Sequence, residues 1–365
     1  MPTMMLALAA LLAACQSETA ETVSRPATPD DQAVATAASG MPAEKRKFRD
    51  WIVACDNGNA CAAIGPGDDG MGFVRVAIQP GPDALPGVTV GLFPPPESGD
   101  RSLTIQIDDR TFPVSEQRDA DPDDPPLGVV QAETPELIRA MAEGEAMTLG
   151  AGEEAVAISL SGASAALLWI DERQGRLDTP TALIRRGDER PAGAVPSPPS
   201  LPRVPVAPAV SQVGLPDVPV LPDSLARDPA VLECAADVSH LDAEFTRPTV
   251  ARLSDGVELW GVSCFAGAYN FGTAYWITGE GGRDPRPAVF AGATGEADNV
   301  LVNAAYDPDT RTIAAFNKGR GLGDCGVDQA WVWSGRAFVL IREASMSECW
   351  GVPSDLWPTT WRTVG

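Results

Sequence analysis

Ten prolines between residues 191 and 222 constrain this chain more than any other feature. A segment of that composition favours an extended, semi-rigid polyproline spacer, which reaches at most ~3.1 Å per residue. The 365 residues are enough for two globular cores, one on each side of the spacer. We therefore predict a first domain at 44–190, a Pro-rich linker at 191–222 and a second domain at 223–365.

A short apolar run at the N-terminus indicates export. Residues 4–14 have the length of a signal peptide and are too few to span a bilayer as a helix. Leu12-Ala13-Ala14-Cys15 resembles the bacterial lipobox, so we expect a signal peptide at 1–14 and a lipid attached to Cys15. An ordinary signal peptide with an incidental cysteine is the alternative. The run departs from the signal-peptide pattern in one respect: no Lys or Arg precedes it, which would place the true start of the protein upstream. Residues 15–43 are poor in large apolar residues and predict a disordered tether.

The remaining cysteines are even in number, and an oxidising compartment makes disulfides their default state. Six cysteines allow fifteen pairings, but their grouping as close pairs favours three of them. These are Cys55 with Cys61, Cys234 with Cys264, and Cys325 with Cys349. For the first pair, a three-residue hairpin loop at 57–59 would place the two cysteines opposite each other.

The pattern of residues 44–190 predicts an α+β domain with a mostly antiparallel sheet. Strand-like runs occur at 51–55, 60–64, 73–78, 88–93 and 103–107. A helix is expected to begin with Thr134 as its N-cap and Pro135 in its first turn, and a second helix is expected at 164–174.

Residues 223–365 predict a mainly β domain, either a sandwich or a small barrel. Strand-like runs are separated by turn signals and lie at 257–264, 274–278, 300–306, 312–316, 330–333 and 337–341.

Several pieces of the chain resemble the bacterial envelope family known as domain of unknown function 1176. They are 48–57, 159–167, 174–176 and 181–183 in the first half, and 267–270, 318–326 and 357–363 in the second. The first half also resembles, more loosely, the invasion-associated locus B proteins. The resemblance implies an exported protein of a Gram-negative bacterium, and it brings no catalytic residues with it.

Two stretches of the second half hold candidate ligand contacts. Gly321-x-Gly323-x-x-Gly326 has the form of a dinucleotide fingerprint but lacks the strand and helix around it, so we interpret it as a tight loop closed by a disulfide. Beside it, the basic pair Lys318 and Arg320 could contact a carboxylate or phosphate, although a solvated loop is the alternative. Trp331 and Trp333 share one face of a strand and could form a platform for sugar rings or a partner's side chains, or pack in the core.

The composition argues against several classes of function. A formal net charge of -23 repels phosphate backbones, so we expect no nucleic-acid partner. His240 is the single histidine and G-x-S-x-G is absent, which disfavours a Ser-His-Asp enzyme and, with no C-x-x-C, a zinc site. The acidic run at 119–124 lacks the Gly and Glu of a calcium loop and is interpreted as a solvated loop. We assign no catalytic residue, metal or cofactor.

These features favour a non-enzymatic, lipid-anchored binding module on the periplasmic face of a Gram-negative envelope. Its expected partners are the membrane, through the lipid, and an envelope protein or glycan, including a basic protein attracted by the acidic charge. Gln16 after the lipidated cysteine favours the outer membrane, by resemblance to bacterial sorting rules. A carboxylate-based hydrolase and a purely structural spacer are the alternatives.

Overall fold

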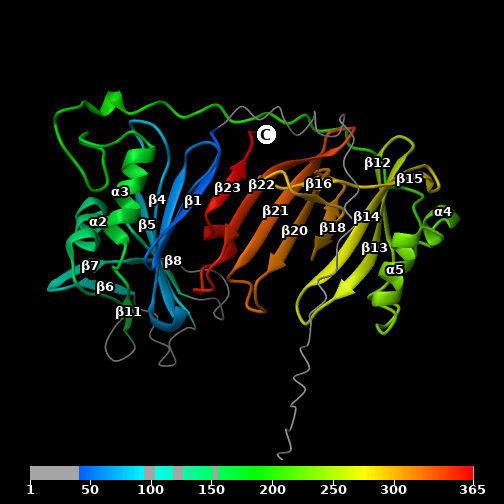
Figure 1. Cartoon of the computed structure of the whole chain (residues 1–365), viewed down its shortest axis with the longest axis horizontal. Coiled ribbons are helices and arrows are strands. Elements are labelled where there is room, and N and C mark those ends of the chain that lie inside the picture. Colours follow the sequence, from blue (N-terminus) through cyan, green and yellow to red (C-terminus); the bar gives the residue numbers. More distant parts are fainter. Residues whose placement is uncertain (1–40, 94–102, 118–125, 132, 151–154, 365) are drawn as a thin grey trace, which may run out of the picture.

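The computed structural model describes residues 41–364 except 94–102, 118–125, 132 and 151–154 (Figure 1). Within these residues the protein consists mostly of antiparallel β-sheets with few helices, and each sheet is an open path of strands rather than a closed barrel. The expected signal peptide, Cys15 and nearly all of the expected tether lie outside the described residues, as does the acidic run at 119–124.

Two sheets make up the first half of the described chain. The larger has the order β1-β2-β3-β4-β5-β9-β8, and the smaller has the order β11-β10-β6-β7. Their bounds are β1 Glu44–Phe48, β2 Trp51–Cys55, β3 Cys61–Pro66, β4 Gly72–Ile78, β5 Gly87–Leu92, β6 Thr104–Ile107, β7 Arg110–Pro113, β8 Ser115–Gln117, β9 Leu127–Val130, β10 Met147–Leu149 and β11 Val156–Ile158. The strands expected at 73–78, 88–93 and 103–107 are therefore present as β4, β5 and β6.

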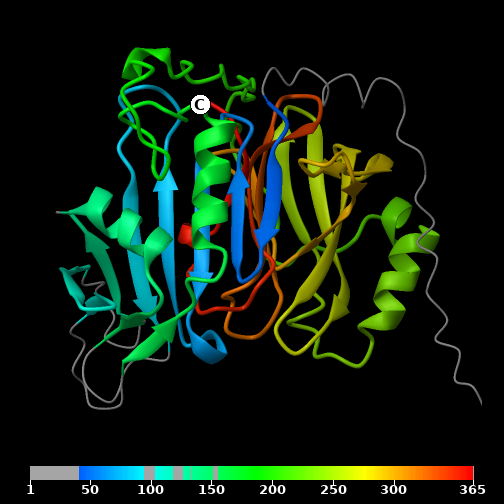
Figure 2. The same cartoon turned by 60° about the vertical axis from the view of Figure 1, so that its left-hand side comes forward.

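Two helices cover these sheets, α2 (Thr134–Glu143) and α3 (Ala163–Arg173). α3 lies across β1, β2 and β3, where its Leu167 and Ile170 are fully buried (Figure 2). Thr134 is not the N-cap that we predicted: Glu133 occupies the cap with a left-handed φ of 59°, and the Thr134 hydroxyl donates instead to the carbonyl of Val130 at 3.1 Å. The helix begins at Thr134, with Pro135 in its first turn as the sequence predicts.

The first hairpin has the predicted loop and disulfide. Cys55 and Cys61 are opposite each other in β2 and β3 and form a disulfide. Asp56 donates its backbone N–H to the carbonyl of Ala60 at 2.9 Å, and Asn59 adopts a φ of 65°, so the loop residues are 57–59. Short-range spacing was sufficient here because both strands and the turn lie within a few residues of each other.

Three sheets make up the second half. One has the order β12-β13-β14-β15 with β18 also on β14, a two-stranded ribbon joins β16 and β17, and the third has the order β19-β20-β21-β22-β23. The bounds are β12 Thr249–Ser254, β13 Val257–Ala266, β14 Phe271–Gly279, β15 Arg283–Pro287, β16 Phe290–Ala291, β17 Ala297–Asp298, β18 Val300–Val302, β19 Ala305–Asp307, β20 Thr312–Lys318, β21 Gly326–Trp333, β22 Phe338–Met346 and β23 Thr359–Arg362.

The strand expected at 300–306 is divided between two sheets. β18 pairs with β14 and β19 pairs with β20, and the break falls at Asn303, whose φ is 47°. Its side-chain amide donates to the carbonyl of Phe316 and to Asn270 Oδ1, both at 2.9 Å. A left-handed residue with these contacts turns the chain from one sheet into the next, which a run of apolar residues could not reveal.

Two helices precede the strands of the second half, α4 (Asp223–Ala226) and α5 (Pro229–Asp237). α5 packs Val231 and Cys234 against Trp260 and Trp276, and Cys234 is bonded to Cys264 of β13. The strand-rich pattern of residues 223–365 predicts almost no helix here. The signal was present, because Asp228 caps the helix by accepting from the Ala230 N–H at 2.9 Å and a proline follows it directly.

The proline-rich residues 191–222 lie along both halves of the protein, as the upper edge of Figure 1 shows. Ala207 is buried and donates its N–H to the carbonyl of Trp333 at 2.9 Å. The carbonyl of Pro202 accepts from Val364 at 3.0 Å, and Gln212 exchanges hydrogen bonds with the backbone of Arg252. In this structure the segment is a packed strap and not a free spacer.

The two halves also meet directly in one apolar cluster. Ile64, Phe73 and Leu127 of the first half pack with Met346 and Trp357 of the second. The other main clusters draw on one half each, with Trp51, Val74 and Leu137 in the first and Trp331, Trp333 and Phe338 in the second. The two halves are therefore held together by this shared apolar cluster as well as by the strap at 191–222.

Candidate functional site

A groove of about 240 Å³ opens at the junction of the two halves. One side comes from β1 and β2, and the other comes from the end of β22, the residues that follow it, and Pro358 before β23. Its lining residues are Lys45, Arg46, Lys47, Ile52, Val53, Ala54, Ser345, Ser347, Glu348 and Pro358. Both halves therefore contribute side chains to one concave surface.

Alternation along β1 separates its three consecutive cations. Lys45 and Lys47 are paired across the strands with Ala54 and Ile52, and share their face of the sheet. Arg46 faces the other way, where its guanidinium pairs with Glu44 at 2.7 Å and lies over the Trp169 ring at 5.4 Å. Two ammonium groups thus remain on the face that meets the second half.

The two lysines have different environments. Lys45 Nζ donates to Ser345 Oγ, and burial of the ammonium lowers the pKa of Lys45, while the negative charge of Glu343 opposes that shift. Lys47 Nζ forms an ion pair with Glu348 Oε1 at 2.8 Å. An added anion would favour the charged form of Lys45, because an opposite charge offsets the desolvation of the ammonium.

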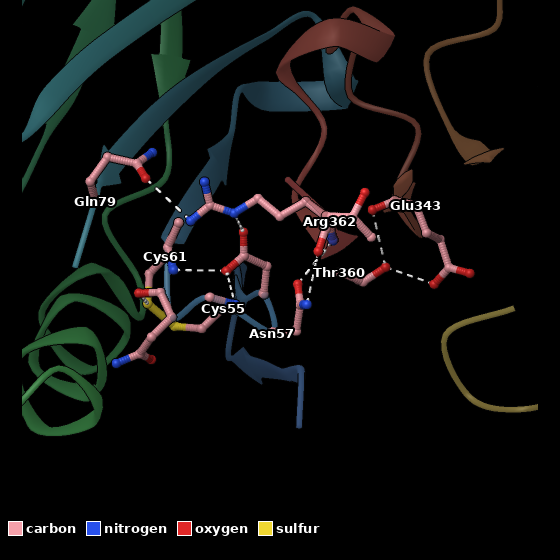
Figure 3. A network of polar contacts seen from close by, with 12 residues as sticks. Cys55, Asn57, Cys61, Gln79, Glu343, Thr360 and Arg362 are labelled. Atoms are coloured by element: carbon pink, nitrogen blue, oxygen red, sulfur yellow. Dashed lines mark hydrogen bonds and ion pairs between the residues drawn. A yellow bond between two sulfur atoms is a disulfide. The ribbon is translucent and has the colours of Figure 1, made fainter. Parts of the chain in front are cut away.

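A polar network lies beside the groove and joins β23 to the first hairpin (Figure 3). The Arg362 backbone N–H donates to Asn57 Oδ1, and Asn57 Nδ2 donates to the Arg362 carbonyl, both at 2.9 Å. The Arg362 guanidinium forms an ion pair with Asp56, 2.5 Å from Nε to Oδ2. Asp56 also accepts from the backbone of Gly58 and Ala60 at 2.8 and 2.9 Å.

Burial governs the carboxyl at the centre of this network. Asp56 is 1% exposed, and desolvation raises its pKa, although the two backbone N–H groups and Arg362 act in the opposite direction. Farther along, Glu343 of β22 accepts from Thr360 at 2.7 Å and from Gln329 at 2.7 Å. Every one of these carboxylates has partners that belong to the fold, which is the arrangement expected of structural groups.

The Gly-rich loop at 319–325 connects β20 and β21, so it has a strand on both sides and is not a nucleotide-binding turn. Cys325 and Cys349 form the predicted disulfide. Asp324 accepts hydrogen bonds from Nε and Nη2 of Arg320, at 2.7 and 2.6 Å, and from the Gly351 N–H at 2.7 Å. Burial alone would raise the pKa of Asp324, but these contacts outweigh it and hold the pKa below its usual value.

This loop supports one wall of the groove without entering it. Arg320 also donates to the carbonyl of Cys349 at 3.2 Å, and Cys349 follows the groove residue Glu348. Lys318 lies with its ammonium 5.8 Å from the centre of the Phe316 ring. The Arg320 side chain is therefore bound by groups of the protein itself, and neither Lys318 nor Arg320 lines the groove.

The tryptophan platform is not available to a ligand in this structure. Trp331 and Trp333 are each 1% exposed in the core of the second half. Their indole N–H groups donate to the carbonyl of Ala291 at 2.8 Å and to Ser254 Oγ at 2.9 Å. The pattern of the sequence could not distinguish the two faces of β21, because a second layer covers the face that carries both rings.

One group in the described residues has the composition of a metal site, namely Asp324 with Cys325 and Cys349. Both sulfur atoms are joined in the disulfide, so neither is a thiolate that could bind zinc.

The groove lysines were missed at the sequence level. The signal was Glu44-Lys45-Arg46-Lys47, which places three cations in succession in a chain with 50 acidic and 27 basic residues. A charge run usually indicates a solvated face. Only the fold shows that residues 345–348, three hundred positions away, close over these lysines.

Comparison with known proteins identifies relatives but no activity. The family model described as "Protein of unknown function (DUF1176)" matches residues 45–364. The uncharacterized protein YpfG of Escherichia coli (strain K12) is 33% identical over 343 residues, which cover 87% of this chain and 93% of the relative. No solved structure matches the chain. No helix among the described residues has both the length and the apolar character needed to cross a bilayer.

Proposed function

Because this chain belongs to the DUF1176 family of proteins of unknown function, as the motifs in its sequence predicted, we propose a function from its own groove. The protein is a non-enzymatic binding module of the cell envelope, and it holds an anionic group of an envelope component between its two halves. The observation that carries this proposal is the pair of lysines, Lys45 and Lys47, in a concave site of a strongly acidic chain.

The charge balance around the groove supports an anionic ligand. Two cations, Lys45 and Lys47, face the groove against one lining carboxylate, Glu348, because Arg46 faces the other side of β1 and pairs with Glu44. The whole chain, in contrast, carries a formal net charge of -23. Ser345 and Ser347 add hydroxyl groups that can donate hydrogen bonds to an anion. The lysines attract an anionic group, whereas the acidic surface around the groove repels anions. A ligand that binds here is therefore expected to carry its negative charge in one small group that fits between the two lysines.

The apolar part of the lining limits the ligand further. Ile52, Ala54 and Pro358 line the groove together with the lysines. A ligand with an anionic group on a sugar or a short peptide would contact both kinds of surface, and a small inorganic ion would contact only one. Carboxylate and phosphate share the required chemistry, and lysine binds either one as a point charge.

Replacing both lysines, Lys45→Gln with Lys47→Gln, is expected to weaken binding of an anionic envelope fragment at least tenfold. Each charge-assisted hydrogen bond contributes about 1.5–3 kcal/mol, and 1.4 kcal/mol corresponds to a tenfold change in affinity. Calorimetric titration of the full protein with soluble muropeptides and with glucosamine 1-phosphate measures the effect and separates a carboxylate source from a phosphate source.

The matched control is the pair Arg227→Gln and Arg283→Gln, which removes the same charge from exposed positions outside the groove. Equal loss of affinity in both pairs would show that only the net charge matters. Absence of binding by the unmodified protein to either probe would sink the proposal.

We place the protein on the periplasmic face of a Gram-negative envelope, held by a lipid on Cys15 and sorted to the outer membrane. The support is the lipobox-like Leu12-Ala13-Ala14-Cys15 followed by Gln16, together with cysteines that pair as disulfides. Cells fed with labelled palmitate are expected to label the unmodified protein, whereas the Cys15→Ser variant should take up none. Label on both proteins, or on neither, would contradict the anchor.

A carboxylate-based hydrolase is the alternative function, and it needs two accessible carboxyls in one cleft. Among the described residues, Asp56 and Asp171 have pKa values raised by burial. Asp56 pairs with Arg362, and Asp171 accepts from the backbone N–H groups of Leu183 and Ile184 at 2.6 and 2.9 Å. Neither lines the groove, so the geometry favours binding over this chemistry.

A further inference from the structure

Three exposed aromatic side chains of the described residues gather at one place on the second half. Phe245 is 52% exposed, Tyr269 and Phe271 are 40% exposed each, and Leu322 nearby is 60% exposed. We call these four residues the aromatic patch. Phe265 lies on the opposite face of the β13–β14 hairpin, because it is paired with Gly272 and its ring covers that glycine. Exposed apolar side chains that occur singly need no explanation, but a contiguous group indicates an interaction surface.

Contacts between neighbouring turns hold the patch together. Tyr269 and Phe271 come from the β13–β14 hairpin, and Leu322 comes from the β20–β21 loop. Tyr269 donates its hydroxyl to the carbonyl of Gly319 at 3.3 Å, and the Asn270 amide donates to the carbonyl of Lys318 at 2.9 Å. The two turns lie side by side at the lower edge in both views of the fold (Figures 1 and 2).

The third contribution comes from the segment after α5. The Phe245 ring stacks on Phe271 with 6.2 Å between the ring centres and 17° between the planes. Ser263 fixes that segment by donating its hydroxyl to the Phe245 carbonyl at 2.9 Å. The segments that carry the exposed aromatic rings are therefore held in place by hydrogen bonds to neighbouring turns.

The charges around the patch are unusual for this protein. Residues 263–272 and 316–323 contain no Asp or Glu, although acidic residues number 50 in the 365 of the chain. The cations of these two stretches are Lys318 and Arg320, and Arg320 is paired with Asp324. Of these two cations, Lys318 has no ion-pair partner among the described residues, and Arg247, two residues after Phe245, is exposed as well. Asp242 and Glu244 flank Phe245 and mark the acidic limit of the patch.

We propose that the aromatic patch rests on the surface of a phospholipid bilayer. Amphipathic and aromatic side chains concentrate at the boundary between lipid headgroups and acyl chains, and a neighbouring lysine is attracted to lipid phosphate. The absence of carboxylates makes these two turns a part of the strongly acidic surface that such a membrane does not repel. The patch orients the protein on the membrane, independently of the groove and of any ligand in it.

The length of chain outside the structure is compatible with this orientation. About 26 residues separate Cys15 from Met41, and an extended chain of that length reaches up to roughly 90 Å. A lipid on Cys15 would keep the protein near the bilayer without setting which face it presents. The aromatic patch would determine which face of the protein contacts the bilayer.

The test uses the mature chain, residues 16–365, exported with a cleavable signal in place of residues 1–15 so that it carries no lipid. Cosedimentation with vesicles of phosphatidylethanolamine containing a minority of phosphatidylglycerol measures its partition coefficient. The double substitution Phe271→Ser with Leu322→Ser is expected to reduce partitioning at least about tenfold. Lys318→Gln is expected to reduce it roughly fivefold, the effect of one basic residue at an anionic surface.

The control is Val213→Ser with Leu232→Ser, which removes two exposed apolar side chains elsewhere. It should leave partitioning unchanged, and thermal unfolding should show that the patch variant still folds. The proposal is wrong if the unmodified chain does not bind vesicles or if the patch variant binds like the control. It is also wrong if the patch substitutions instead abolish self-association in the absence of lipid, since the surface would then join two copies of the chain.

Discussion

Replacing Gly162 with alanine is expected to destabilise the protein by about 4 kcal/mol. Gly162 precedes α3 with a φ of +104°, and a Cβ at this position would lie 1.8 Å from the carbonyl oxygen of Phe48. That oxygen belongs to backbone at the end of β1, where Phe48 is paired with Trp51. Because the backbone cannot yield as a flexible side chain would, the clash adds to the cost of the left-handed conformation. Urea unfolding under oxidising conditions measures the loss.

The matched control is Gly295→Ala. Gly295 has a φ of +87°, and a Cβ there would meet nothing within 4 Å. This variant should lose only about 1 kcal/mol, the cost of placing alanine at a positive φ. The difference between the two variants isolates the contact with Phe48. Equal losses of stability in the two variants would mean that β1 and the start of α3 can move apart enough to admit a Cβ, and that the close contact between Gly162 and Phe48 does not require glycine.

Arg362→Ala is expected to cost about 3 kcal/mol of stability. It removes the partner of Asp56, a carboxyl that is 1% exposed, and it leaves a buried charge held only by backbone N–H groups. The loss of one partner from a fully buried ion pair costs about 3–5 kcal/mol, and the partial exposure of Arg362 reduces that figure. Arg336→Ala, an exposed arginine on the β21–β22 turn, is the control and should change stability little.

The effect of Arg362→Ala should depend on pH. Burial raises the pKa of Asp56, so the folded state binds the proton more tightly, and stability falls as the pH rises from the ordinary Asp value of about 3.9 through the raised pKa. Without Arg362 that pKa rises further. The deficit of the variant should therefore be largest near neutral pH and shrink on acidification, and Asp56→Asn in the same background should recover part of it. A deficit that is independent of pH would contradict this account.

The elements predicted most accurately are those whose signals are local. The β2–β3 hairpin with its disulfide, the helix at 163–173 and the strands β4, β5 and β6 each depend on residues near one another in the chain. Helix α5 has a local signal too, Asp228 followed by Pro229, but it is a short helix among strand-like runs, so the pattern of the region predicts a mainly β domain. The break at Asn303 was missed because its cause is a set of contacts with Asn270 and Phe316.

The candidate site could not be predicted for a similar reason. Lys45 and Lys47 are adjacent to Ser345 and Glu348 only after the two halves meet, and no spacing along the chain encodes that meeting. Trp331 and Trp333 were considered for a surface role because alternation shows that two side chains share a face without showing what covers it.

The sequence by itself determined the mostly antiparallel strands, the three disulfide pairs and the family to which the chain belongs. Only the tertiary structure decided that residues 191–222 pack as a strap, that Asp56 and Arg362 join the halves, and that a basic groove opens beside them. The physical reason is range. Strand period, turn chemistry and cysteine spacing act over a few residues, whereas burial, desolvation and ion pairing depend on which distant surfaces exclude water from each other.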